Sequence, residues 1–226
     1  MYGGAANAGT VTALPSWHPE SANFSPFPVH AWVVRHRDGV LLVDTGIGTD
    51  NARINEWYRP VIIPLADALD SIGLHISDIT AVVISHLHFD HCGQHAALEA
   101  PVFVQAAEYE AAQNPGYTIP EWAAIDADRL RVVRGEHQLL DGVRLLPTPG
   151  HTPGHQSVIV ETAAGRVALA GQCAFRAIEL HTGIPASTNL HDEGWCDIAR
   201  ESLACIRALA PIDVHLSHDT EVVIFH

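Results

Sequence analysis

The amino-acid pattern predicts an α/β fold in which two packed β-sheets are covered by helices. The chain has 226 residues, of which 47% are hydrophobic, and this is enough to bury one sizeable core. Short apolar runs of strand type recur in both halves, and segments with helical spacing stand between and after them. Strands in runs with interspersed helices favour two sheets that pack together with helices outside.

The first half predicts a hairpin, a helix and a buried strand. Residues 1–28 are rich in Gly, Ala, Ser and Pro, which predicts an irregular N-terminal segment. Strand-type runs at 29–36 and 40–44 flank the turn signal Arg37-Asp38-Gly39. Residues 61–74 have helical spacing, with an apolar face made of Ile62, Leu65, Ala66, Leu69 and Ile72. A buried strand at 81–85 leads directly into a run of histidines.

The second half continues in the same style, with neither an internal repeat nor a linker. We expect helices at 108–113 and 197–209, the second with an apolar face made of Ile198, Leu203, Ile206 and Leu209. We expect strands at 101–105, 131–134, 138–146, 156–161, 166–170 and 213–217. Residues 1–226 therefore predict a single domain.

Charge and cysteine content narrow the function classes. Twelve Lys and Arg against 26 Asp and Glu give a formal charge of −14, which argues against a nucleic-acid partner. No apolar stretch has the length of a membrane span, and the first residues lack the pattern of a signal peptide. The four cysteines form no CxxC pair, so we expect reduced thiols in a cytoplasmic protein.

The strand at 81–85 ends in the run Ser85-His86-Leu87-His88-Phe89-Asp90-His91. His86 and His88 are two residues apart, so they share one side of an extended segment, and Asp90 continues that register. One short loop can therefore offer imidazoles to one metal ion, and Asp90 with His91 to a neighbouring ion. The alternative is a polar loop with incidental histidines, which three histidines and an aspartate within six residues make improbable.

A second motif stands at residues 149–155, Pro-Gly-His-Thr-Pro-Gly-His. Its prolines and glycines predict a rigid turn that presents His151 after a strand. A plain turn with incidental histidines is the alternative for this motif taken alone.

These motifs together resemble the metallo-β-lactamase superfamily. His86-x-His88-x-Asp90-His91 is preceded by Val43-Asp44-Thr45-Gly46 and followed by the motif at 149–155, and the resemblance covers residues 29–219. Residues 85–93, 148–157 and Ser217-His218-Asp219 resemble the N-acyl-homoserine lactonase branch in particular. The resemblance implies a four-layer αββα sandwich with metals at one edge of the sheets.

The resemblance also implies a set of site residues. The first metal would be held by His86, His88 and His151, and the second by Asp90, His91 and His218. Asp44 and Asp219 would orient ligand imidazoles, as metal-bound histidines usually require. A plain turn residue at a strand end is the alternative for each of these two aspartates.

The chain departs from the family pattern at two positions. The family carries an aspartate that bridges both metals in a context like Leu-x-Gly-Asp, whereas this chain has Leu169-Ala170-Gly171-Gln172. We expect Gln172 at the bridging position, where a neutral amide offers a carbonyl oxygen but no charge. Three residues later, lactonases carry a tyrosine that hydrogen-bonds the substrate carbonyl, and here Phe175 has no donor. Phe175 should line the substrate pocket. Other aromatic residues could line it too, although core packing is the favoured explanation for each of them, namely Trp17, Phe24, Phe27 and Trp122.

The implied activity is hydrolysis of a lactone or carboxylic ester by metal-bound hydroxide, with Asp90 as the proton shuttle to the leaving alkoxide. We expect two zinc ions per chain, with the second ion bound more weakly. Other divalent metals are the alternative to zinc. The expected partner is a small-molecule substrate, and we expect binding to neither nucleic acid nor a membrane. The sequence does not decide the oligomeric state, for which a homodimer is one alternative. The alternatives are a hydrolase of a thioester, amide or aryl ester, and an inactive metal-binding relative.

Overall fold

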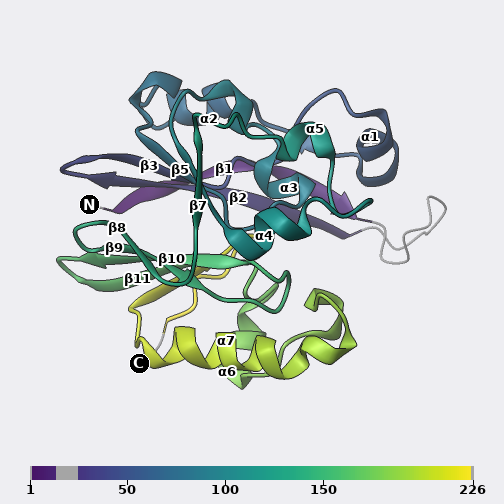
Figure 1. Ribbon diagram of the computed structural model, residues 1–226. Coiled ribbons are helices and arrows are strands. Elements are labelled where there is room, and N and C mark those ends of the chain that lie inside the picture. Colours follow the sequence, from purple (N-terminus) through teal and green to yellow (C-terminus); the bar gives the residue numbers. More distant parts are fainter. Residues whose placement is uncertain (1, 14–24, 225–226) are drawn as a thin grey trace.

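Two β-sheets pack face to face with helices on both outer sides (Figure 1). The computed structural model describes residues 2–13 and 25–224. The outer side of one sheet carries α1 (Ala52–Tyr58), α2 (Leu65–Asp70) and α5 (Pro120–Ala123). The outer side of the other carries α6 (Ala177–Thr182) and α7 (Cys196–Ala208). The expected αββα sandwich is therefore confirmed.

Within the described residues, the first sheet has the strand order β4-β1-β2-β3-β5-β6-β7. Its strands are β1 (Tyr2–Ala13), β2 (Ser25–His36), β3 (Gly39–Val43), β4 (Val61–Ile62), β5 (Ala81–Val83), β6 (Val102–Gln105) and β7 (Leu130–Val133). β3 and β5 are parallel, with Leu41 opposite Ala81 and Val43 opposite Val83. The residues that follow these two strands, Asp44 and Ser85, therefore emerge at the same edge of the sheet.

The second sheet has the order β12-β11-β10-β9-β8 among the described residues. Its strands are β8 (His137–Leu140), β9 (Val143–Pro147), β10 (Gln156–Thr162), β11 (Gly165–Gly171) and β12 (Asp213–Leu216). β11 and β12 are parallel, so Gln172 and His218 follow them at one edge. The loop from β9 to β10, which contains His151, leaves the antiparallel pair at that edge as well.

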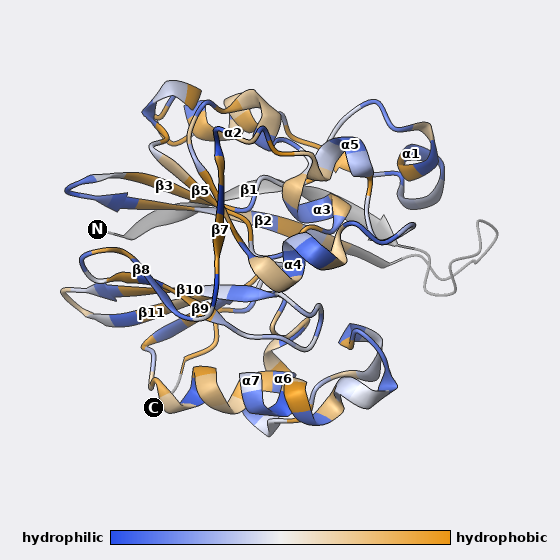
Figure 2. Ribbon diagram, viewed as in Figure 1, coloured by the Kyte–Doolittle hydropathy of each residue, from blue (hydrophilic) through white to orange (hydrophobic). Residues whose placement is uncertain are grey.

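The core follows the two-residue alternation of the strands. Leu41 and Val43 of β3 pack between the two sheets, whereas Leu42 faces the helical layer that contains Leu65 and Leu69 of α2. In the second sheet, Val158 packs between the sheets and Ile159 faces the other helical layer. Figure 2 shows hydrophobic residues along the strands and a mixture of hydrophobic and hydrophilic residues on the helices. Burial of these apolar faces holds the four layers together.

Short helical elements shape the loops above the sheet edge. The α-helical turns are α3 (Phe89–Cys92) and α4 (Ala106–Ala111). The 3₁₀ turns are Ile76–Asp78, His95–Ala97, Ser187–Asn189 and Glu193–Trp195. None of the helices in the described ranges is both long and apolar enough to traverse a lipid bilayer.

Four sequence-based expectations about individual elements are wrong. Residues 2–13 and 25–28, which we expected to be irregular, lie in β1 and β2, because backbone pairing between these strands compensates for a Gly- and Ala-rich sequence. Residues 61–74 begin with β4, and only Leu65–Asp70 is helical after Pro64. Residues 138–146 form parts of two strands that turn at Asp141 and Gly142, the latter at φ 75°. Ile198 is 37% exposed, and Ala199 takes its expected place on the buried face of α7.

A buried glutamine joins the two sheets behind the sheet edge. The backbone N–H of Gln156 donates to the Ser85 carbonyl at 2.9 Å. Its side-chain Nε2 donates to the carbonyls of Ile84 at 2.9 Å and Phe103 at 3.2 Å, while its Oε1 accepts from Gln105. The Gln156 side chain is fully buried, so these bonds replace the water that its amide would otherwise bind.

We predict that Gln156→Leu lowers the free energy of unfolding by about 1–3 kcal/mol, because it removes the three side-chain hydrogen bonds of a fully buried amide. Urea denaturation of the metal-free protein measures this change. Gln113→Leu is the matched control, because Gln113 is exposed and donates only to a carbonyl of its own helix turn. Equal stability of the two variants would contradict a role for Gln156 in joining the sheets.

Candidate metal centre

A buried aspartate organises the loop that follows β5. Asp44 Oδ1 accepts from the Ser85 N–H at 2.6 Å, and Oδ2 accepts from the Ser85 hydroxyl at 2.7 Å. Asp44 Oδ2 also accepts from His91 Nδ1 at 2.8 Å. Asp44 adopts the left-handed backbone conformation, at φ 61°, which aspartate tolerates better than most residues. This backbone bend turns the carboxylate toward the loop, where it fixes the orientation of one imidazole.

Asp90 and His91 reach the site through a helical turn. We expected Asp90 to continue the extended register of His86 and His88, but the chain enters α3 at Phe89. The helical turn places Asp90 Oδ2 at 3.5 Å from His91 Nε2 and 3.5 Å from His218 Nε2. His218, which follows β12, completes this group of three residues.

His151 lies on a loop that Glu108 ties to the histidine run. Glu108 Oε1 accepts from the N–H of Leu87 at 2.7 Å, between His86 and His88. Glu108 Oε2 accepts from the Thr152 hydroxyl at 2.7 Å and from the N–H of Gly154 at 3.2 Å. Glu108 is fully buried in α4, so one carboxylate holds the two loops that carry these imidazoles.

Four imidazoles have Nδ1 occupied by a fixed neighbouring group. Because a neutral imidazole carries one N–H, donation from Nδ1 leaves a lone pair on Nε2. The Nδ1 partners are Ser85 Oγ for His86 at 3.1 Å, Asp44 for His91 at 2.8 Å, the Asn189 carbonyl for His151 at 3.1 Å and the Pro28 carbonyl for His218 at 2.9 Å. The Ser85 hydroxyl gives its proton to Asp44, so its oxygen is free to accept from His86.

The nitrogen and oxygen atoms converge in two neighbouring sets. One set is His86, His88 and His151, and the other is Asp90, His91 and His218; within each set the ligand atoms lie within 4.8 Å of one another. The rings of His86 and His91 are 4.0 Å apart between centroids, so the two sets adjoin. The structure thus brings together all six residues that the resemblance assigned to metals.

Burial and neighbouring charge set the protonation of the site. Burial lowers the pKa of His88 to about 4 and that of His218 to about 4, against the opposing charge of Asp90. Burial also lowers the pKa values of His86 and His151. Burial lowers the pKa of His91 too, but the carboxylates of Asp90 and Asp44 raise it further, to about 10. The first set therefore consists of neutral imidazoles, which is the form that binds metal.

The donor set fits a transition metal such as zinc. The Nε2 atoms of His86 and His91 are buried and have no hydrogen-bond partner among the described residues. A buried polar atom without a partner is costly unless an ion binds it. Three imidazoles in one set, and two imidazoles with a carboxylate in the other, match the usual three protein ligands of an open zinc site.

Gln172, which we expected at the bridging position, lies beside the second set. Its Oε1 is 3.0 Å from His218 Nε2, and its Nε2 donates to Asn189 Oδ1 at 3.0 Å. Its backbone N–H donates to His155 Nε2 at 2.9 Å, so the lone pair of His155 is already used. Gly171 adopts φ 59°, and a Cβ there would lie 2.8 Å from His155 Nε2, which restricts this position to glycine.

Two phenyl rings enclose the outer side of His218. Phe175 stacks on the His218 ring at 4.9 Å, and Phe27 meets the same ring edge-on at 5.1 Å. Phe175 and Phe27 contact each other at 5.2 Å. Trp122 packs in the hydrophobic core near Ile47 and Tyr58, while Trp17 and Phe24 lie outside the described residues. The second set therefore has an apolar wall beside it.

Asp219 has a different position from the one we expected. Its Oδ2 accepts from the backbone N–H of Ala177 at 2.9 Å, and its Oδ1 lies 3.7 Å from Arg176. These contacts anchor the first turn of α6, because a carboxylate stabilises a helix N-terminus. Asp219 therefore supports the segment after Phe175 and does not follow the Asp44 arrangement.

The sequence interpretation missed four residues that organise the site. They are Ser85, Glu108, His155 and Asn189. His155 and Ser85 stood inside the motifs, so their positions were visible but their partners were not. Glu108 and Asn189 lie in segments without a motif, and only the folded chain brings them to the ligand loops.

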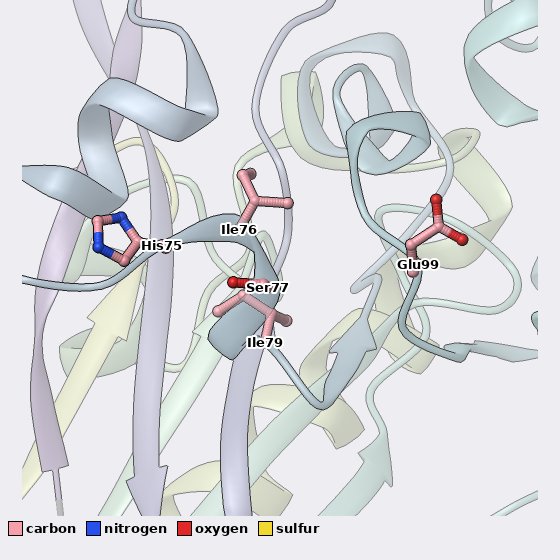
Figure 3. A pocket seen from close by; sticks show the side chains of 5 residues that line it. All are labelled: His75, Ile76, Ser77, Ile79 and Glu99. Carbon is pink, nitrogen blue, oxygen red and sulfur yellow. The ribbon is translucent and has the colours of Figure 1, made fainter.

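A separate surface pocket lies away from the histidines. It has a volume of about 450 Å³ and is lined by His75, Ile76, Ser77, Ile79 and Glu99 (Figure 3). Figure 3 shows the His75 and Glu99 side chains on separate segments, well apart from one another. None of the six converging residues contributes to its lining.

Comparison with known proteins agrees with this geometry. The family model described as the metallo-beta-lactamase superfamily matches residues 24–215. An N-acyl homoserine lactonase of Bacillus sp is 35% identical over 149 residues, covering 60% of this chain and 59% of that protein. An N-acyl homoserine lactonase of Bacillus cereus is 33% identical over 153 residues, covering 62% and 61%. The matched part thus spans about three fifths of the length of these curated relatives.

Similarity to a solved structure extends over more of the chain. The crystal structure of a quorum-quenching N-acyl homoserine lactone hydrolase superimposes with a TM-score of 0.79 at 26% identity. The superposition covers 98% of this chain and 97% of that one.

The two sets should differ in how metal binding depends on pH. In the metal-free protein His91 keeps its second proton up to about pH 10, so an ion that enters the second set must displace that proton. The pKa of His88 near 4 implies no such competition in the first set at neutral pH. We predict that affinity for the second ion rises about tenfold per pH unit between about pH 6 and about pH 9, while affinity for the first changes little.

Calorimetric titration of metal-free protein with zinc at several pH values, in buffers of different ionisation enthalpy, measures both the affinities and the protons released. The same pH dependence for both ions would contradict the assignment of His91 to the second set, apart from His86, His88 and His151.

Proposed function

Because the chain belongs to the metallo-beta-lactamase superfamily, we propose that it is a metal-dependent hydrolase that opens a lactone or cleaves a carboxylic ester. The observation that carries the proposal is the pair of adjoining three-residue sets, one with three imidazoles and one with two imidazoles and a carboxylate. Similarity to N-acyl homoserine lactonases supports a lactone as the substrate.

We propose zinc as the metal, with two ions per chain. Imidazole and carboxylate donors in sets of three suit zinc, while manganese, cobalt and iron compete for the same ligands. Bound metal lowers the pKa of a coordinated water toward neutrality and polarises a carbonyl group. The second ion is the weaker one in this proposal, because Asp90 is the only carboxylate among the six ligands and Gln172 brings no charge.

Asp90 is placed to move the proton. Burial raises its pKa, but the neighbouring His91 and His218 lower it by more, so the carboxylate is ionised at neutral pH. Its Oδ2 adjoins both imidazoles of the second set. Asp90 can therefore accept the proton of the attacking water and pass it to the leaving alkoxide.

Phe27 and Phe175 supply the apolar side of the substrate site. Their rings cover His218, which keeps water from this side of the second set and offers contact to an acyl chain. Phe175 offers no hydroxyl to a substrate carbonyl, and this difference favours a second candidate activity on thioesters, amides or aryl esters. We also propose a cytoplasmic location, which four unpaired cysteines among the described residues support.

A substrate panel on zinc-loaded protein tests the proposed activity. It should contain homoserine lactones of increasing acyl length, simple lactones, aryl esters, an amide and thioesters. Turnover of a lactone or ester that a chelator abolishes and added zinc restores is the expected result. Zinc-loaded protein that hydrolyses no member of the panel would contradict the proposal and favour an inactive metal-binding relative.

We predict that His151→Ala abolishes hydrolysis and reduces bound metal, since it removes one of three ligands of the first set. Elemental analysis and turnover of the purified variant measure both effects. His75→Ala is the matched control, because His75 is exposed, lies outside both three-residue sets, and contacts Asp70 and the turn Ile76–Asp78. Full activity of His151→Ala with unchanged metal content would show that the first set is not the site.

The pair Gln172 and Phe175 should decide which substrate class the site prefers. Phe175→Tyr adds a hydroxyl donor and Gln172→Asp adds a charge beside the second set. One well-aimed donor to a developing oxyanion is typically worth about 10²–10³ in rate. We expect the parent to exceed the double variant on its own substrate, and the double variant to gain on homoserine lactones.

Kinetics of both proteins on both substrate classes test this prediction, with metal content measured in parallel. A double variant that keeps its metals and is unchanged on every substrate would show that these two residues lie outside the reacting region.

A further inference from the structure

The side chain of Asn189 makes a closed pair of hydrogen bonds with Gln172. Asn189 Nδ2 donates to the backbone carbonyl of Gln172 at 3.2 Å. Gln172 Nε2 donates to Asn189 Oδ1 at 3.0 Å. Asn189 is buried, with 3% exposure, on the 3₁₀ turn Ser187–Asn189. Residues 17 positions apart in sequence are thus joined through both ends of one amide.

Donor and acceptor chemistry allows only one orientation of these amides. The Gln172 backbone carbonyl can only accept, so Asn189 must turn Nδ2 toward it. Asn189 Oδ1 then faces the Gln172 side chain, and because an oxygen only accepts, Gln172 must present Nε2. The carbonyl oxygen Oε1 of Gln172 is left on the opposite side, 3.0 Å from His218 Nε2.

In that orientation, lone pairs of Gln172 Oε1 and His218 Nε2 point at each other. His218 donates its Nδ1–H to the Pro28 carbonyl at 2.9 Å, so in the neutral imidazole Nε2 is an acceptor. Nε2 and Gln172 Oε1 therefore face each other as two acceptors, and a cation close to both removes the repulsion. A separation of 3.0 Å suits two adjacent ligands of one ion whose bonds are about 2.1 Å long.

We propose that Asn189 is a positioning residue that holds Gln172 with its carbonyl oxygen toward the second metal, so that Gln172 is a neutral oxygen ligand in place of a carboxylate. The inference rests on the metal centre of the proposed function. Asn189 also touches the first set, because its backbone carbonyl accepts from His151 Nδ1 at 3.1 Å. Asn189 therefore orients His151 of the first set through its backbone carbonyl, and Gln172 beside the second set through its side chain.

Replacement of Asn189 by leucine separates these two contacts. Asn189→Leu removes both side-chain hydrogen bonds to Gln172 and keeps the backbone carbonyl that orients His151. We expect the affinity for the second ion to fall about 10–100-fold, as for other residues that orient a metal ligand, with the first ion unaffected. Thr188→Val is the matched control, because Thr188 is the exposed neighbour on the same turn.

The measurement is competition between metal-free protein and a chromophoric chelator for zinc, with the absorption spectrum of the cobalt-substituted protein as a second readout. The competition measures the affinity for each ion, and the cobalt spectrum depends on the ligands of the ion. Neither measurement needs a substrate. Failure of the proposed lactone hydrolysis would therefore leave this result unchanged.

A conservative variant and a double substitution distinguish positioning from a general effect on folding. Asn189→Asp keeps an acceptor for Gln172 Nε2 but loses the donor to the Gln172 backbone carbonyl, so second-ion affinity should fall less than in Asn189→Leu. In a Gln172→Leu background, Asn189→Leu should cause no further loss, because its effect passes through the missing amide. Equal losses at both ions, equal losses in Asn189→Leu and Asn189→Asp, or additive losses in the double variant would overturn the proposal.

Discussion

The site depends on one constraint, which is that a neutral imidazole has a single N–H. Four of the converging histidines give that proton to a fixed neighbour: a serine hydroxyl, an aspartate carboxylate and two backbone carbonyls. Their Nε2 atoms are then directed toward common points, with free lone pairs on His86, His151 and His218 and, once its second proton is displaced, on His91. The fold must keep those four acceptors in fixed positions. They lie in strands, at strand ends and on a buried turn, where backbone hydrogen bonds restrict movement.

Two of these acceptors, Asp44 and Ser85, follow parallel strands, whereas the Asn189 carbonyl lies on a 3₁₀ turn and the Pro28 carbonyl lies in β2. β3 and β5 run in parallel and deliver Asp44 to Ser85 and His91, while β11 and β12 run in parallel and deliver Gln172 to His218. Gln156 joins the two sheets directly behind this edge, through its backbone to Ser85 and its amide to Ile84. The distance between the two sets is therefore a property of how the sheets pack.

Charge distinguishes this centre from one with a bridging aspartate. Asp90 is the carboxylate of the second set, and Asp44 and Glu108 lie behind the imidazoles, where they orient loops. A neutral amide at Gln172 leaves the centre one charge more positive than an aspartate would. Its orientation depends on Asn189, because an amide, unlike a carboxylate, has only one oxygen to offer.

From the sequence alone, the fold class and most of the candidate site could be predicted. Histidine and aspartate spacing around residues 86–91 and 149–155 pointed to five of the six converging residues, because such clusters form locally and leave a readable pattern, while His218 was assigned by the family resemblance. Short apolar runs such as Leu41, Leu42 and Val43 predicted the strands for the same reason. Tertiary structure alone decided the strand character of residues 2–13, the role of Asp219, and the contacts of Glu108 and Asn189. These depend on partners distant in the chain, as when Asn189 meets Gln172, and hydrogen bonds between distant segments leave no periodic signal in a sequence.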